Sequence, residues 1–164
     1  DDAVSRELPV LLHTVNDLER IGDHAMNLAE IAERKVEHNQ TFSEAAVAEA
    51  REAIAETEAM FTAMITALEK DDIQQAHQVL THEGRINRLQ VQLRRHHVCR
   101  MTDGVCTAET GIIFIDLVDN LEKIGDHMTN IAQSLIGGAR WLGIEGNTLS
   151  GEFEAITGQD VPAE

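Results

Sequence analysis

The sequence has few of the residues that interrupt helices and few that cross-link small domains. Its only prolines are Pro9 and Pro162, so no proline breaks a helix between them. Aromatic residues make up 3% of the chain, and tyrosine is absent. Cys99 and Cys106 are the only cysteines, too few for a disulfide framework and not spaced as zinc ligands, so we expect both thiols to be reduced. The scarcity of proline favours long helices.

Basic residues are also scarce. The chain has 13 Lys and Arg against 29 Asp and Glu, which gives a formal net charge of −16. Such a surface repels nucleic-acid phosphates and suits cations, so we expect no nucleic-acid partner. No secretory signal pattern is apparent, and Asp116 interrupts the longest apolar run, so we expect a cytoplasmic domain without a membrane span.

Apolar residues recur at helical spacing along most of the sequence. We expect four long helices, at about 4–38, 41–70, 73–102 and 108–140, and an acidic, Gly-rich tail over 142–164. Candidate N-terminal caps are Thr41 with Glu44, Asp72 with Gln75, and Thr107, whereas Gly104 marks a helix end. Because the connections are short, the prediction is an antiparallel up-down helical bundle.

One segment occurs twice, 103 residues apart. Residues 16–30 read NDLERIGDHAMNLAE and residues 119–133 read DNLEKIGDHMTNIAQ, with eight of fifteen positions identical. Each copy carries a glycine in mid-helix, Gly22 or Gly125, at a cost of roughly 1 kcal/mol relative to alanine. A cost repeated in both copies suggests close approach of a helix or ligand. We therefore expect the first and fourth helices to be adjacent through these glycine faces.

The repeated segment also carries the chemistry. In each copy a Glu and an Asp stand four residues apart, on one helix face. The acids are Glu19 and Asp23 in the first copy, and Glu122 and Asp126 in the second. Hard oxygen ligands at this spacing suit a di- or trivalent metal ion, although exposed acids on a solvated helix face are the simpler explanation. The histidines that follow, His24 and His127, are more typical of packing or hydrogen-bonding residues than of ligands.

The same segments, DLERIGDHAMNLAE and NLEKIGDHMTNIAQ, resemble the signature of PhoU-like domains. The stretch HHVCRMTDGVCTAETGIIFIDLVDNLEKIGDH further resembles the cytoplasmic domain of bacterial sodium/phosphate cotransporter-family proteins. The resemblance implies two three-helix units, each ending in a motif-bearing helix. Residues 1–40 would then be the last helix of a truncated first unit, 41–141 a complete second unit, and 142–164 a tail.

The resemblance also implies a site and a role. The ligands of a multinuclear Fe, Zn, Mn or Mg site would be Glu19, Asp23, Glu122 and Asp126, with Asp119 a weaker candidate. Where relatives supply a further acid, this sequence has Asn87, and Arg85 adds opposing charge. The implied role is non-enzymatic regulation of phosphate uptake at the inner face of the cell membrane. The partners would be a transporter membrane domain, in the same chain or another, or transport and signalling proteins.

Two other functions stay open from the sequence. The first is a structural interaction bundle that holds no metal. The second, a metalloenzyme, is the least favoured, because no nucleophile or acid–base pair is identifiable. Assembly is a further expectation. The first helix carries two apolar stripes, and if its unit is truncated, Val10, Ile21, Leu28 and Ile31 would be exposed unless a second chain covers them. We therefore expect a homodimer or higher oligomer around this helix.

Overall fold

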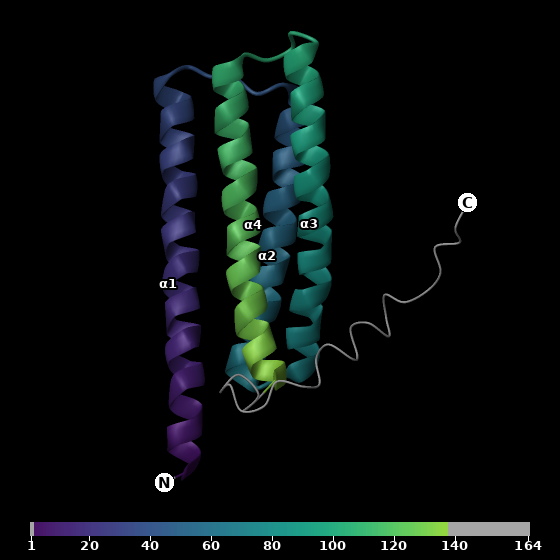
Figure 1. Cartoon of the computed structure of the whole chain (residues 1–164). Coiled ribbons are helices and arrows are strands. Elements are labelled where there is room, and N and C mark those ends of the chain that lie inside the picture. Colours follow the sequence, from purple (N-terminus) through teal and green to yellow (C-terminus); the bar gives the residue numbers. More distant parts are fainter. Residues whose placement is uncertain (1, 138–164) are drawn as a thin grey trace, which may run out of the picture.

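The structure is a computed structural model that describes residues 2–137, with side chains from residue 8 onward. It contains α1 (Asp2–Glu37), α2 (Glu44–Lys70), α3 (Ile73–Thr102) and α4 (Ala108–Gly137). Successive helices run in opposite directions, which confirms the antiparallel up-down bundle (Figure 1). The predicted tail over 142–164 lies outside the described residues. No helix within 2–137 combines the length and the apolar character needed to cross a membrane.

Most helix ends follow the predicted chemistry. The Asp72 side chain accepts hydrogen bonds from the backbone N–H groups of Gln74 and Gln75, and the Thr107 hydroxyl accepts one from Thr110. Gly104 follows the end of α3 in the left-handed region, with φ of 68°. The prediction for α2 was wrong by two residues. Ser43, not Thr41, is its N-cap and accepts from the backbone N–H of Ala46 at 3.2 Å.

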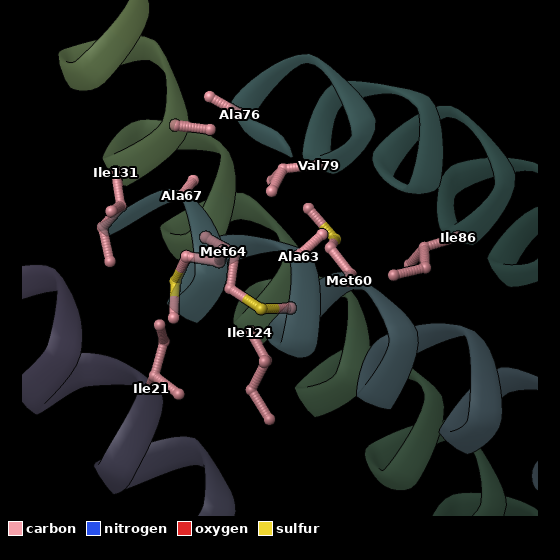
Figure 2. Packing of buried hydrophobic residues seen from close by; sticks show 12 residues of the cluster. Ile21, Met60, Ala63, Met64, Ala67, Ala76, Val79, Ile86, Ile124 and Ile131 are labelled. Atoms are coloured by element: carbon pink, nitrogen blue, oxygen red, sulfur yellow. The ribbon is translucent and has the colours of Figure 1, made fainter. Parts of the chain in front are cut away.

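The four helices are not equivalent in their packing. Helices α2, α3 and α4 contact one another and form a three-helix unit, whereas the backbone of α1 lies beside α4 alone. Figure 1 shows the N-terminal end of α1 extending past the ends of the other helices. Two clusters of buried apolar side chains fill the bundle, the larger around Met60, Met64 and Met128. In Figure 2, Ile21 of α1 points toward this cluster beside Ile124 of α4.

The predicted adjacency of the first and fourth helices is correct, but the predicted faces are wrong. No heavy atom lies within 4 Å of a Cβ built on Gly22, which is exposed on the outside of α1. A Cβ built on Gly125 would contact Ile86 of α3 and Met60 of α2 at 3.7–3.8 Å, so this glycine faces the three-helix unit. Neither glycine lies between α1 and α4. The two positions are equivalent in sequence and differ in what surrounds them.

The stripe of α1 predicted to be exposed is instead the one that α4 covers. Ile21 and Ile31 are buried, and Val10 and Leu28 are half-buried. The exposed side chains belong to the other apolar stripe, which includes Leu8, Leu11, Leu12 and Val15. The sequence identified both stripes, but which one meets α4 is decided by the packing.

Candidate functional site

The repeated motif forms a reciprocal polar junction between α1 and α4. The Nδ1 atom of His127 lies 2.8 Å from Oδ1 of Asp17, and the Asn130 amide donates to the same oxygen at 3.3 Å. In the other direction, Nδ1 of His24 lies 2.9 Å from Oδ1 of Asn120, which also accepts from Asn27 at 3.1 Å. Asp17 and Asn120 occupy equivalent positions in the two copies, so the junction has approximate two-fold symmetry.

The two histidines meet at the centre of this junction. Their rings stack with centroids 5.7 Å apart and planes inclined by 29°. Asp17, which anchors one side, is among the few buried charged residues of the described chain. Because a carboxylate only accepts hydrogen bonds, Nδ1 of His127 carries the proton in this contact. The histidines are therefore hydrogen-bonding residues of an interface, as their positions favoured, and Asp17 is a partner that the sequence did not single out.

The predicted acids of the first copy lie on the solvent side of α1. Glu19 and Asp23 are both exposed, away from the face that meets α4. Asp23 pairs with Arg20 at 3.5 Å, and the side chains of this pair are each 58% exposed. An ion pair so open to solvent contributes little to stability, about 0–1 kcal/mol. The structure does not bring these two acids together with those of the second copy.

The acids of the second copy are half-buried beside α3. The Lys123 ammonium lies 3.1 Å from Glu122 and 2.8 Å from Asp126, and these contacts raise the pKa of Lys123, the Asp126 hydrogen bond most. The weaker candidate, Asp119, accepts from Nε of Arg94 at 3.0 Å. Each acid of this copy therefore already has a cationic neighbour. Within residues 2–137 no three or more His, Cys, Asp or Glu side chains gather as a metal-binding group.

A polar groove of about 520 Å³ opens beside Asp126, between α3 and α4. Glu83 of α3 faces Asp126 across it, and the pKa of Glu83 is raised, first by burial and then by the charge of Asp126. Thr129, also in the groove, has a buried hydroxyl oxygen with no hydrogen-bond partner. The sequence analysis missed Glu83. Its signal is its place one turn before Asn87, the position where a further acid was expected.

The arginines of α3 pair with acids of the neighbouring helices. Arg85 contacts Glu56 of α2 at 3.4 Å, and Arg94 contacts Asp119 of α4. Arg100 lies 2.8 Å from Glu49, a carboxyl that burial alone would shift upward but whose pKa the hydrogen bonds from Arg100 and His96 lower overall. The basic residues between Arg85 and Arg100 therefore include several that join helices of the unit.

A tight contact beside this ion pair involves a glycine that the sequence analysis did not single out. His97 is buried and stacks on Phe114 with ring centroids 4.9 Å apart, and burial lowers its pKa. A Cβ built on Gly111 would lie 2.8 Å from Nε2 of His97 and 2.7 Å from the sulfur of Met101. Position 111, rather than 22 or 125, is therefore where the bundle leaves no room for a side chain.

The comparison with known families covers both copies of the repeat. The family model for the PhoU domain matches residues 2–32 and 50–135. The chain belongs to the PhoU domain family. It is 27% identical over 135 residues to the phosphate-specific transport system accessory protein PhoU homolog 1 of Thermotoga maritima, covering 80% of this chain and 56% of that protein. It is 29% identical over 137 residues to a PhoU homolog of the same description from Xylella fastidiosa, covering 80% and 54%.

This PhoU-domain chain thus spans about half the length of the curated relatives it matches. No solved structure matches it. The all-α bundle predicted from the sequence agrees with the family, and in this chain the two copies of the motif meet at the α1–α4 junction described above.

Proposed function

We propose that this PhoU-domain chain is a non-enzymatic regulatory module of a phosphate transport system. The observation that carries the proposal is the family match, which extends over both copies of the motif. The relatives from Thermotoga and Xylella are named as accessory proteins of phosphate-specific transport. Their role is extended here to a chain that spans about half their length. A phosphatase screen tests the non-enzymatic part, and turnover above that of an inactive control protein would contradict it.

We further propose that the module acts on the cytoplasmic face of the membrane. Its partner would be the membrane domain of a sodium/phosphate cotransporter-family protein, or transport and signalling proteins. The support is the resemblance of the stretch from His96 through His127 to the cytoplasmic domains of those cotransporters. The net charge of −16 speaks against a nucleic-acid partner.

The role is tested by measuring phosphate uptake in the host. Disruption of this domain should make labelled-phosphate uptake insensitive to external phosphate, because a regulatory module couples the two. Restoring the wild-type domain should restore the response. A variant with a disrupted α1–α4 junction, Asp17→Ala, tests whether the bundle itself is needed. Uptake that responds to external phosphate equally with and without the domain would contradict a regulatory role.

Metal binding is a separate proposal, centred on the second copy. We propose that Asp126 of α4 and Glu83 of α3, the two acids that line the polar groove, hold a di- or trivalent ion there, with the neighbouring Glu122 outside the groove. Two observations support this placement. A cation would offset the repulsion between the Glu83 and Asp126 carboxylates, which contributes to the raised pKa of Glu83, and the hydroxyl oxygen of Thr129, which has no hydrogen-bond partner, could serve as one of its ligands. Such an ion would supply a fixed positive charge at the α3–α4 surface. Lys123 opposes it, since its ammonium already neutralises part of the charge.

The exposed pair Glu19 and Asp23 serves as the matched comparison for this site. We expect that Glu83→Gln with Asp126→Asn lowers affinity for Mn, Fe or Zn at least tenfold in calorimetric titration, with metal content checked by elemental analysis. Glu19→Gln with Asp23→Asn removes the same charge from an exposed face and should change affinity less. Equal affinity in wild type, both double variants and the quadruple amide of Glu19, Asp23, Glu122 and Asp126 would contradict metal binding by these acids.

The alternative is an interaction bundle that uses no metal. It is favoured by the cationic neighbours that the structure already gives to the acids, namely Arg20 beside Asp23, Lys123 beside Glu122 and Asp126, and Arg94 beside Asp119. Regulation of uptake that persists in metal-free protein carrying the Glu83 and Asp126 amides would support this alternative.

A further inference from the structure

Three side chains with sulfur or ring-nitrogen donor atoms meet where α3 passes into α4, at the end of the bundle opposite the N-terminus (Figure 1). Two of them, His97 and Met101, stand four residues apart and therefore share one face of α3. The third is Cys106, in the connection to α4. Gly104, with φ of 68°, reverses the chain after α3, and Sγ of Cys106 comes to lie 3.7 Å from Nε2 of His97.

The imidazole of His97 is buried without a strong hydrogen-bond partner. The residue is 1% exposed, its Nδ1 has no partner, and within the described residues its Nε2 meets only the sulfur of Cys106. Because sulfur forms weak hydrogen bonds, the ring is poorly satisfied. Burial first, and then the charge of Arg100, lower the pKa of His97, so the ring is neutral at pH 7. Neutral imidazole is the form that binds metal ions.

Gly111 of α4 allows the third donor to join the other two. A Cβ built on this glycine would lie 2.8 Å from Nε2 of His97 and 2.7 Å from Sδ of Met101. Both atoms are thus close to one point and therefore close to each other. A side chain at position 111 would displace one or both of them, so glycine here keeps the nitrogen and the thioether sulfur together beside Cys106.

The distance between the Cys106 sulfur and the His97 nitrogen is that of two ligands on one metal ion. A metal–nitrogen bond of about 2.0 Å and a metal–sulfur bond of about 2.3 Å, at an angle of roughly 110–120°, separate the two atoms by about 3.6–3.8 Å. The observed separation is 3.7 Å. The third donor is a thioether, so this cluster differs from the His, Cys, Asp and Glu groups considered above.

The donors and the neighbouring charge favour a soft, monovalent ion. Thiolate and thioether sulfur select Cu(I), whereas a structural zinc ion takes four ligands and this cluster offers three. Arg100 already places a positive charge near His97. A thiolate at Cys106 cancels the charge of a monovalent ion but leaves a divalent ion with a net positive charge, which Arg100 would repel.

We propose that Cys106, His97 and Met101 bind one Cu(I) ion. On binding, the Cys106 S–H bond breaks, its proton goes to solvent, and the thiolate forms a bond to the ion, so no oxidant or reductant is needed. The ion would replace a weak sulfur–nitrogen contact and join the α3–α4 connection to α3. All three ligands belong to the three-helix unit of α2, α3 and α4. The site does not depend on the phosphate proposal or on the groove beside Asp126.

Titration of the 164-residue chain with Cu(I), without oxygen and in competition with the chelator bicinchoninate, tests the site. We expect one ion per wild-type chain and a loss of affinity of about a hundredfold in Cys106→Ser, because the only thiolate is removed. Cys99→Ser is the matched control, since Cys99 is an exposed thiol near the same end of α3, and it should bind like wild type. Equal weakening by the two serine variants, or a wild type that binds no tighter than Cys106→Ser, would overturn the proposal.

The other two ligands need separate tests. Met101→Leu keeps the bulk of the side chain without the sulfur and should lower Cu(I) affinity about tenfold, and an unchanged affinity would overturn its assignment as a ligand. His97 is buried, so its role is measured without substitution. The X-ray absorption spectrum of the Cu(I)-loaded wild type should show scattering from both sulfur and imidazole. Sulfur scattering alone would overturn His97 as a ligand.

A protection experiment distinguishes the site from binding to any free thiol. One equivalent of Ag(I), a soft monovalent ion that is stable in air, is added before alkylation with iodoacetamide, and modified peptides are mapped by mass spectrometry. We expect Ag(I) to protect Cys106 while Cys99 is alkylated at its rate in ion-free protein. Protection of both cysteines alike, or of neither, would overturn the proposal.

Discussion

Helices α1 and α4 contain nearly the same motif in two different surroundings. Within the described residues, Leu11, Val15 and Leu18 of α1 are exposed, whereas the equivalent residues of α4, Phe114, Val118 and Leu121, are buried in a cluster with α2 and α3. The acids differ in the same way, because Asp23 is exposed and Asp126 borders a polar groove opposite Glu83. At the α1–α4 junction the two copies have equivalent contacts, because the His and Asn of each copy meet Asp17 or Asn120 of the other. The comparison shows that both copies of the motif contribute to one interface between helices, while the burial of their other faces depends on which helices lie beside them.

The largest expected change in unfolding free energy comes from truncating apolar side chains to alanine at equivalent positions of the two copies. Phe114→Ala should lower the free energy of unfolding by about 3–5 kcal/mol, because it leaves a cavity among buried side chains. Leu11→Ala, at the equivalent position, should change it by less than about 0.5 kcal/mol, because this side chain is exposed. Denaturant titration of the dilute protein measures both. Similar losses at the two positions would mean that α1 has a cover within its own chain.

The junction should respond to loss of its buried carboxylate. Asp17→Ala leaves the Nδ1–H of His127 and the amide of Asn130 without their acceptor, at a cost of about 1–3 kcal/mol in unfolding free energy. Asp17→Asn should cost less, since it retains an oxygen acceptor and reproduces the arrangement at Asn120. The exposed neighbour Asn16→Ala is the control. If Asp17→Ala and Asn16→Ala were equally mild, the junction would not hold α1 to α4.

Introducing a large side chain should change the free energy of unfolding in opposite directions at Gly125 and Gly22. Gly125→Leu should cost about 1–3 kcal/mol, because Ile86 and Met60 leave room for a methyl group but not for a branched chain. Gly22→Leu faces open space and should stabilise the isolated chain by up to about 1 kcal/mol through helix propensity. Thermal or denaturant unfolding of the dilute protein measures both. Destabilisation of equal size at position 22 would contradict its exposed placement.

The smallest effect concerns the acids in metal-free buffer. Because the folded-state pKa of Glu83 is raised above 4.5, the protonated form favours folding at low pH, and this contribution is lost as pH rises through the folded-state pKa. Glu83→Gln should therefore be more stable than wild type at neutral pH, with the difference disappearing in acid. Glu19→Gln on the exposed face of α1 should show no such trend. Unfolding curves between pH 3 and 7 decide this, and a Glu83→Gln variant less stable than wild type at pH 7 would count against crowding of the acids.

The sequence by itself determined the helices, because the signals that start, continue and end each helix lie within that helix or next to it. Helical spacing, the absence of proline between Pro9 and Pro162, and caps such as Asp72 and Thr107 depend on residues within a few positions of one another. The repeat likewise identified His24 and His127 as related positions and the first and last helices as neighbours. Composition and motif together were sufficient for the family.

Only the tertiary structure decided which faces of those helices are used. Both apolar stripes of α1 have suitable spacing, and the choice of the one with Ile21 follows from the contacts that α4 offers. The need for glycine at position 111 and the pairing of Glu83 with Asp126 likewise arise between helices. Pattern along a chain gives the direction of a side chain around its own helix axis, whereas burial and charge depend on what the other helices place opposite it.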